Sequence, residues 1–431
     1  NYAVKANGKV VRKGKTFLDI EPQGTQELTV NVAGLQPKAG TEYFVNFWVT
    51  TTEPEILIPV GHEIASEQFR LPIEPLTVAE HKASGKTSVT TEGDEVKVSS
   101  SKMQFVFNKK SGLVTSYKVN GTEYFTEGFG IQPNFWRAPN DNDYGNGQPK
   151  REQIWKQSSK NFKVADVITE ADGNNTVLTA NYLLAAGNLY IVKYTIYPDG
   201  VVHADITFTS TDMEEGKTEV SEATLMATFS PGQQEARRAA SKLVVPRIGV
   251  RFRLPADMNQ VEYFGRGPGE NYIDRQRASH IDLYKTTADA MYTNNYVRPQ
   301  ENGHRTDTRW VELTRKNGKG LKIVADQCIG FNALRNSVED FDSEEAVGKL
   351  RQWNNFTPEE IANRSEEKAK DVLRHMTHIN DITPRNFVEV CVDMKQQGVA
   401  GFNSWGDRPL AEHTMPANQE YKWGFTLIPV K

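Results

Sequence analysis

Short segments that alternate apolar and polar residues recur along this chain, and turn-forming residues separate them. The clearest example is a run of three such segments, 176–184, 189–197 and 201–210. Gly187-Asn188 and Pro198-Asp199-Gly200 stand between them and are typical of tight turns. A period of two places successive side chains on opposite faces of a β-strand. We therefore predict a three-stranded meander here and an all-β fold for the chain.

The same pattern predicts a second hairpin, and helix signals are few. Alternating segments at 309–315 and 321–325 are joined by Lys316-Asn317-Gly318-Lys319, a strong turn sequence. A capping box with Pro at the first helical position, Thr357-Pro358-Glu359-Glu360, predicts one short surface helix. The charged run 365–371 that follows is typical of a solvated face.

Composition excludes several classes of protein. The chain has 431 residues, of which 38% are hydrophobic and 25% charged, as in globular proteins. It lacks an apolar run of about 18 residues, so no transmembrane span is predicted. A formal net charge of −4 gives no excess of positive charge of the kind that binds nucleic acid or an anionic membrane. The chain starts with Asn1-Tyr2 and has no signal-peptide pattern, so we interpret it as a piece of a longer protein whose compartment stays unknown.

Changes in the pattern divide the chain into three parts. Residues 1–73 contain short alternating segments, including 27–32 and 41–51, and predict a small β-sandwich. Segment 74–90 is polar and loses the alternation, so we expect a linker there. The alternation returns in residues 91–431, which are too many for a small sandwich and predict a large two-sheet assembly.

The two cysteines, Cys328 and Cys391, stand in apolar, strand-like surroundings. We expect two buried free thiols, and the sequence alone leaves a disulfide between them open. A count of two rules out the disulfide framework of a small secreted domain.

Three patterns that can bind phosphate or metal ions are better explained by structural roles. The glycines of 265–269 follow a strand, but no helix N-terminus comes next to hold a phosphate. Segment 141–146 resembles a calcium loop, but its fifth and sixth positions are Gly145 and Asn146, where such a loop needs a ligand and then a glycine. We therefore expect a turn that caps backbone N–H groups, and a bound cation is the weaker alternative. His375 and His378 have a zinc-like spacing without a further ligand. We predict no metal site in this chain.

Four stretches carry the strongest functional signal. They are PNFWRAPNDNDYG at 133–145, YFGRGPGENYIDR at 263–275, YVRPQENGHRTD at 296–307 and GFNSWG at 401–406. In this order they resemble the C-terminal region of β-galactosidases of glycoside hydrolase family 2. The resemblance covers nearly the whole chain and is weakest over the first 75 residues.

The resemblance implies an architecture and a role. Such enzymes have a TIM barrel with two glutamates of a retaining mechanism, then an immunoglobulin-like linker domain and a large β-supersandwich similar to galactose mutarotases. No strand–helix alternation indicates a barrel in this chain, so we expect no catalytic residue and no cofactor in it. The parent enzyme would hydrolyse terminal β-D-galactosides, with Mg or Na as its ions. It would form a homo-oligomer in the cytoplasm or periplasm, and this chain's partners would be the barrel and galactose or a β-galactoside.

The resemblance also assigns a sugar platform. In the family, a loop that ends in Ser-Trp reaches the active site of the barrel, and Ser404 and Trp405 match it. Phe402 and Asn403 replace the family's acidic pair, which leaves Asn403 and Ser404 as weaker candidates for substrate binding. An aromatic ring held on a loop can stack on the C–H face of a sugar, whereas a Trp is otherwise more often a core residue.

A polar cleft is the second candidate site. Four polar residues from these stretches could meet sugar hydroxyls: Arg137, Asp141, Glu301 and Asn302. The alternative is that such charges, set among aromatic residues, pair with one another and are buried between the sheets.

Two other functions fit the same sequence. One is a carbohydrate-binding module with its own sugar site on the large sandwich. The other is a purely structural domain that supports assembly.

Overall fold

The structure is a computed structural model of the chain. It describes residues 1–209, 231–232, 235, 242–293, 295–342, 378–399, 401–403 and 405–431. The predicted capping box at 357–360, His375 and Ser404 lie outside the described residues.

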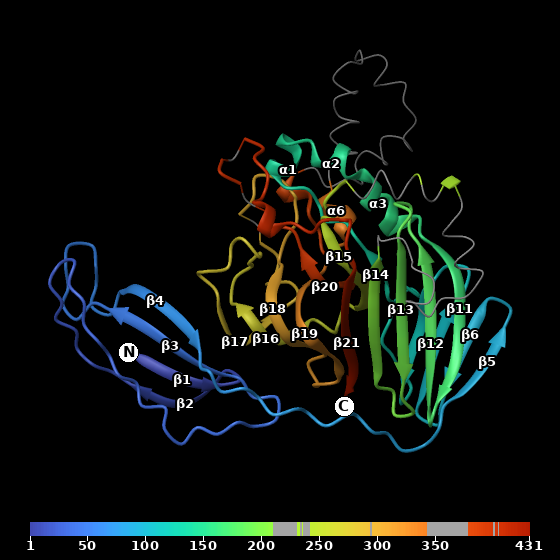
Figure 1. Cartoon of the computed structure of the whole chain (residues 1–431), viewed down its shortest axis with the longest axis horizontal. Coiled ribbons are helices and arrows are strands. Elements are labelled where there is room, and N and C mark those ends of the chain that lie inside the picture. Colours follow the sequence, from blue (N-terminus) through green and yellow to red (C-terminus); the bar gives the residue numbers. More distant parts are fainter. Residues whose placement is uncertain are drawn as a thin grey trace, which may run out of the picture.

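The described fold is mostly β, as predicted, with a small N-terminal sheet beside a large curled β-supersandwich (Figure 1). The small sheet has the strand order β2-β1-β3-β4, with all neighbours antiparallel. Its strands are β1 (Tyr2–Ala6), β2 (Lys9–Gly14), β3 (Tyr43–Thr50) and β4 (Glu63–Arg70). The strand predicted at 41–51 is confirmed as β3, whereas the one predicted at 27–32 is wrong. That segment is mostly exposed and pairs with no strand, and alternation alone cannot hold a strand without a neighbour to bond.

The large unit consists of two sheets. A five-stranded sheet runs in chain order from β5 to β9. Its strands are β5 (Ser88–Glu92), β6 (Glu95–Ser99), β7 (Met103–Asn108), β8 (Leu113–Val119) and β9 (Thr122–Glu123). Segment 71–87 connects β4 to this sheet by passing beneath the large sheet from one side of the molecule to the other (Figure 1).

The second sheet has twelve strands in the order β10-β15-β20-β19-β21-β14-β13-β12-β11, with β16, β17 and β18 branching from β19. The strands are β10 (Gln132–Asn134), β11 (Lys163–Asp172), β12 (Asn175–Leu183), β13 (Leu189–Ile196), β14 (Val202–Thr209), β15 (Arg247–Pro255), β16 (Gln260–Gly267), β17 (His280–Thr287), β18 (Arg305–Thr314), β19 (Gly320–Leu334), β20 (Phe387–Gln396) and β21 (Tyr421–Val430). The predicted meander is confirmed as β12-β13-β14 and the predicted hairpin as β18-β19.

Aromatic side chains fill the space between the two sheets. Phe105 on β7 lies with its ring centroid 5.4 Å from that of Tyr194 on β13. Phe125, just after β9, lies 5.4 Å from Phe252 on β15. Burial of these rings supplies much of the hydrophobic driving force that holds the sheets together.

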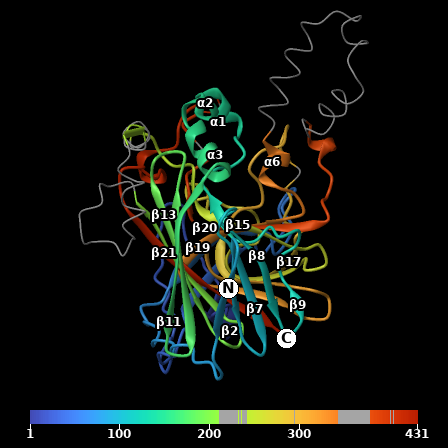
Figure 2. The same cartoon turned by 90° about the vertical axis from the view of Figure 1, so that its right-hand side faces the viewer.

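Short helices gather at one end of the large unit, where the C-terminal loop also lies (Figures 1 and 2). They are α1 (Asp141–Gly145), α2 (Gln148–Arg151), α3 (Gln153–Lys160) and α6 (Val338–Phe341). Two 3-10 turns, Ile379–Asp381 and Ala411–His413, are also present. None of the helices in the described ranges is long and apolar enough to cross a membrane.

Cys391 is buried and Cys328 is exposed, and both are free thiols. The prediction of two buried thiols is therefore wrong for Cys328. The reason lies in β19, which pairs with β21 over 320–325 and with β20 over 330–334. Cys328 falls in the interval between these ladders, where β19 changes neighbours and its side chains face solvent.

Candidate functional site

Trp405 is held out from the surface on a short loop. We name this the Trp405 loop, comprising the described residues 401–403 and 405–407. The Trp405 side chain is 89% exposed and Phe402 is 85% exposed. Two bonds from the backbone to side chains fold the loop: the Trp405 N–H donates to Asn403 Oδ1 at 2.9 Å, and the Phe402 N–H donates to Asp407 Oδ2 at 2.8 Å. Asn403 therefore shapes the loop that displays the indole.

Helix α1 braces this loop. Asn142 donates from Nδ2 to the Asn403 carbonyl at 3.1 Å and accepts from the Gly406 N–H at 3.3 Å. The backbones of Gly145 and Gly406 touch, and a Cβ added to Gly145 would lie 2.6 Å from Gly406 Cα. Gly406 has φ +111°, a conformation that L side chains rarely adopt. The contact between helix and loop thus requires glycine on both sides.

Segment 141–146 forms this helix and its C-cap, and Asn140 is the N-cap. Asn140 and Asp143 make a reciprocal capping box, in which the Asp143 N–H donates to Asn140 Oδ1 at 2.8 Å and the Asn140 N–H donates to Asp143 Oδ2 at 3.1 Å. The carboxylate-rich turn therefore satisfies backbone N–H groups, which is the role the sequence favoured.

Asp141 lies at the exposed start of α1 and meets a neighbouring segment. Arg298 places Nε 2.7 Å from Asp141 Oδ1 and its guanidinium 3.9 Å from the centre of the Tyr144 ring. Beside it, Val297 is 91% exposed. The structure thus adds Phe402 on the Trp405 loop itself, and Arg298 with its exposed neighbour Val297 beside α1. Phe402 carried a sequence signal, since it shares the Gly-rich stretch, whereas nothing in the sequence marks Val297 as exposed.

Arg137 lies behind α1 and is fully buried. Its guanidinium donates to both carboxylate oxygens of Asp143, at 3.0 and 2.9 Å. It also donates to the carbonyls of Gln397 and Gly398, at 2.7 and 3.0 Å. Arg137 therefore ties α1 to the strand end from which the Trp405 loop departs, and does not itself face solvent.

Glu301 and Asn302 are buried in a second polar cluster. Arg247, also fully buried, lies 2.9 Å from Glu301 Oε1 and 3.2 Å from Asp393 Oδ2. Asn302 bonds both backbone groups of Thr293, accepting from its N–H at 2.7 Å and donating to its carbonyl at 2.6 Å. These contacts fix the chain that leads to Val297 and Arg298.

The second cluster shifts the ionisation of its members. Burial raises the pKa of Asp393 to about 7, although the charge of Arg247 opposes the rise. Burial likewise raises the pKa of Glu301, again against Arg247. Burial lowers the pKa of His304 well below its ordinary value, and the positive charge of Arg247 adds to this effect. Arg247 thus compensates the buried carboxylates of Glu301 and Asp393, and His304 stays neutral.

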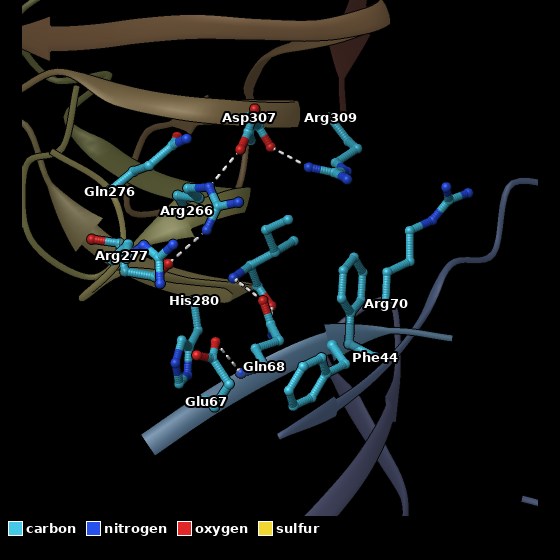
Figure 3. Close-up of a pocket in the computed structure, with 13 residues that line it drawn as sticks. Phe44, Glu67, Gln68, Arg70, Arg266, Gln276, Arg277, His280, Asp307 and Arg309 are labelled. Carbon is cyan, nitrogen blue, oxygen red and sulfur yellow. Dashed lines mark hydrogen bonds and ion pairs between the residues drawn. The ribbon is translucent and has the colours of Figure 1, made fainter. Parts of the chain in front are cut away.

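A separate cavity lies between the small sheet and the strands β16–β18 (Figure 3). Its volume is about 560 Å³. Gln68 of β4 donates from Nε2 to the Ile281 carbonyl at 2.8 Å and accepts from the Ile281 N–H at 2.7 Å. Arg266 forms an ion pair with Asp307 on the opposite wall. The cavity shares none of the residues predicted to bind sugar, and the two Gln68 bonds join the small sheet to the large unit.

Two family models match this chain. The model described as β-galactosidase small chain matches residues 99–427, and the model described as β-galactosidase domain 4 matches residues 1–72. The chain belongs to the β-galactosidase small-chain family. The resemblance inferred from the four motifs is therefore confirmed at the level of the family.

Curated relatives of this family align with the whole chain. A β-galactosidase from Priestia megaterium is 28% identical over 100% of this chain and 36% of its own length. One from Halalkalibacterium halodurans is 25% identical over 99% of this chain and 36% of its own length. The chain thus spans about a third of the length of these relatives. Among solved structures, a galactose 1-epimerase from Lactobacillus acidophilus covers 81% of the chain at 8% identity, with a TM-score of 0.38.

Proposed function

We propose that this chain is the C-terminal, non-barrel part of a retaining β-galactosidase that hydrolyses terminal β-D-galactosides. Family membership supports this proposal, and so do the curated relatives, which bear the name β-galactosidase and extend well beyond the region matched here. A retaining mechanism needs two carboxyl groups about 5 Å apart, one as acid/base and one as nucleophile. In this proposal the barrel supplies both, and this chain supplies neither.

The role of this chain in catalysis is to complete the sugar pocket with the Trp405 loop. The observation that carries the proposal is the 89% exposure of Trp405 on a loop that α1 braces. An exposed indole is unfavourable in water, and covering one face with the C–H face of a sugar recovers part of that cost. A rigid platform also binds without first paying the entropy of ordering the loop.

A second role is to support assembly with the barrel. Phe402, Trp405 and Val297 are all more than 80% exposed, and Val297 precedes Arg298, which pairs with Asp141 of the helix that braces the Trp405 loop. The matching family is described as a small chain, a name that fits a part working together with a larger one. We propose that the barrel covers part of this surface and that the sugar site lies between them.

Mixing separately produced parts tests this function. The barrel-containing remainder of the protein is expected to be nearly inactive towards a chromogenic β-galactoside and to gain activity when this chain is added. This chain with Trp405→Ala serves as the matched control, since it should still associate in size-exclusion chromatography but restore less activity. Full activity of the remainder alone would contradict the proposal.

A further inference from the structure

Three side chains of metal-ligating types converge on the outer face of the large sheet. They are His203 and Asp205 on β14 and Asp326 on β19, and their donor atoms all lie within 4.8 Å of one another. His203 and Asp205 are two residues apart on one strand, so they share a face. Strand β21 runs between β14 and β19. Asp326 is far from the other two residues in sequence, and only the sheet brings it to them.

Strand β21 makes room for the convergence at one position. Gly424 stands opposite Asp205 in the β14–β21 register. A Cβ at Gly424 would collide with Oδ2 of Asp326. Because this position has no side chain, the Asp326 carboxylate can cross β21 and approach the pair on β14.

A second position on β21 orients the imidazole. Thr426 stands opposite His203, and its Oγ1 lies 3.0 Å from His203 Nδ1. With Nδ1 engaged, Nε2 faces the two carboxylates, 3.2 Å from Asp205 Oδ1 and 3.5 Å from Asp326 Oδ2. Histidines that bind metals typically have the other ring nitrogen fixed in this way by a neighbouring polar group.

The spacing of the donors fits a small cation. Nitrogen and oxygen ligands lie about 2.0–2.2 Å from zinc, which separates two ligands of a tetrahedral site by about 3.4 Å. The donor separations of 3.2 and 3.5 Å bracket that value. We propose that His203 Nε2, Asp205 and Asp326 bind a divalent transition-metal cation of the zinc class. Three protein ligands leave at least one coordination position for water.

The open side of this His203–Asp205–Asp326 cluster is accessible. His203, Asp326 and Thr426 line a groove of about 870 Å³ that segment 78–83 and Tyr197 also border. Water and small ions can therefore reach the cluster without any movement of the sheet. The groove is distinct from the cavity of Figure 3 and from the surface around Trp405.

Protons compete with the metal for this cluster. The hydrogen bond to Asp205 raises the pKa of His203 against a smaller opposing effect of burial, and Asp326 adds to the rise. The hydrogen bond with His203 lowers the pKa of Asp205 although burial opposes this, and the charge of Lys193, opposite Asp205 on β13, adds to the fall. Metal binding should displace the His203 proton and should therefore tighten as the pH rises above the pKa of His203.

Zinc titration of the untagged, chelator-treated protein at pH 7.5 tests the site. We expect one Zn²⁺ per chain with the wild type and at least a roughly 10-fold weaker affinity in His203→Gln and in Asp326→Asn, because even second-shell changes cost about 10- to 100-fold. His81→Gln is the matched control, since His81 borders the same groove and pairs with Asp199 instead. It should bind zinc as the wild type does.

Equal zinc affinity in the wild type and the His203 and Asp326 variants would overturn the proposal, as would the absence of saturable binding. Imidazole NMR signals give a measurement that needs no variant. Added Zn²⁺ should shift the His203 signal and abolish its titration. A His203 that titrates unchanged in saturating zinc would leave only an ion pair between a protonated imidazole and two carboxylates, and would refute the site.

Discussion

Removing the Trp405 ring should lower kcat/KM and leave the stability of the fold nearly unchanged. The indole is already 89% exposed, so Trp405→Ala in the full-length protein removes little packing, and we expect a change below about 0.5 kcal/mol in unfolding free energy. A buried Trp would cost about 3–5 kcal/mol. A sugar face that covers roughly 50–100 Å² of the ring is worth about 1–2.5 kcal/mol at about 25 cal/mol per Å². That range corresponds to a loss of roughly 5- to 70-fold in kcat/KM.

The assay compares steady-state kinetics on a chromogenic β-galactoside with the melting temperature. Phe402→Ala is the comparison variant: it removes another aromatic ring, 85% exposed on the same loop, and so separates loss of the sugar platform from loss of exposed apolar surface. Trp405→Phe should retain part of the activity, since a smaller ring still offers a stacking face. A wild-type kcat/KM in Trp405→Ala would refute the reasoning, and so would a large fall in melting temperature with unchanged kinetics.

Four further results are expected. The isolated chain should hydrolyse no β-galactoside, and turnover that survives purification controls would contradict this. Limited trypsin digestion should cut first at Lys82 or Lys86, both exposed, whereas a first cut inside the 176–210 meander would argue against the linker. Gly406→Ala should lower kcat/KM as Trp405→Ala does, because its φ of +111° and its contact with α1 exclude a side chain. Burial alone would raise the pKa of Glu339, but Arg251 outweighs this effect and holds the pKa below its ordinary value of 4.5. The folded state is therefore stabilised by the ionised carboxylate, and the urea midpoint of unfolding should fall as the pH drops below 4.5. This fall should be smaller in Glu339→Gln.

Local sequence patterns were sufficient for much of the fold. The β12-β13-β14 meander followed from alternation between two strong turns, and each of its strands has a neighbour adjacent in sequence. Segment 27–32 had the alternation without a partner strand and remains outside the sheets. The exposure of Cys328 depends on where β19 changes its neighbouring strand, and that point is set by β20 and β21, which come much later in the chain. Such non-local pairing leaves no trace in a local pattern.

The candidate site shows the same division. The exposure of Trp405 could be expected because the loop sequence lacks the alternation of a strand. The positions of Arg137, Glu301 and Asn302 could not, because a charged or amide side chain among aromatic residues looks alike whether it lines a cleft or is buried with a partner. The His203–Asp205–Asp326 cluster was also beyond the sequence, since its third ligand comes from a strand two places away in the sheet.

Buried charge and exposed aromatic surface have complementary roles at the helical end of the molecule. Burying a guanidinium is costly unless it is paired, and the two terminal nitrogens of Arg137 are paired with Asp143 and two backbone carbonyls. The bonds can form only when α1 and the 397–398 segment hold one relative position, so they fix the base of the Trp405 loop. The indole can then be held in place without being buried. A rigid support beneath an exposed ring is what a preorganised sugar platform requires.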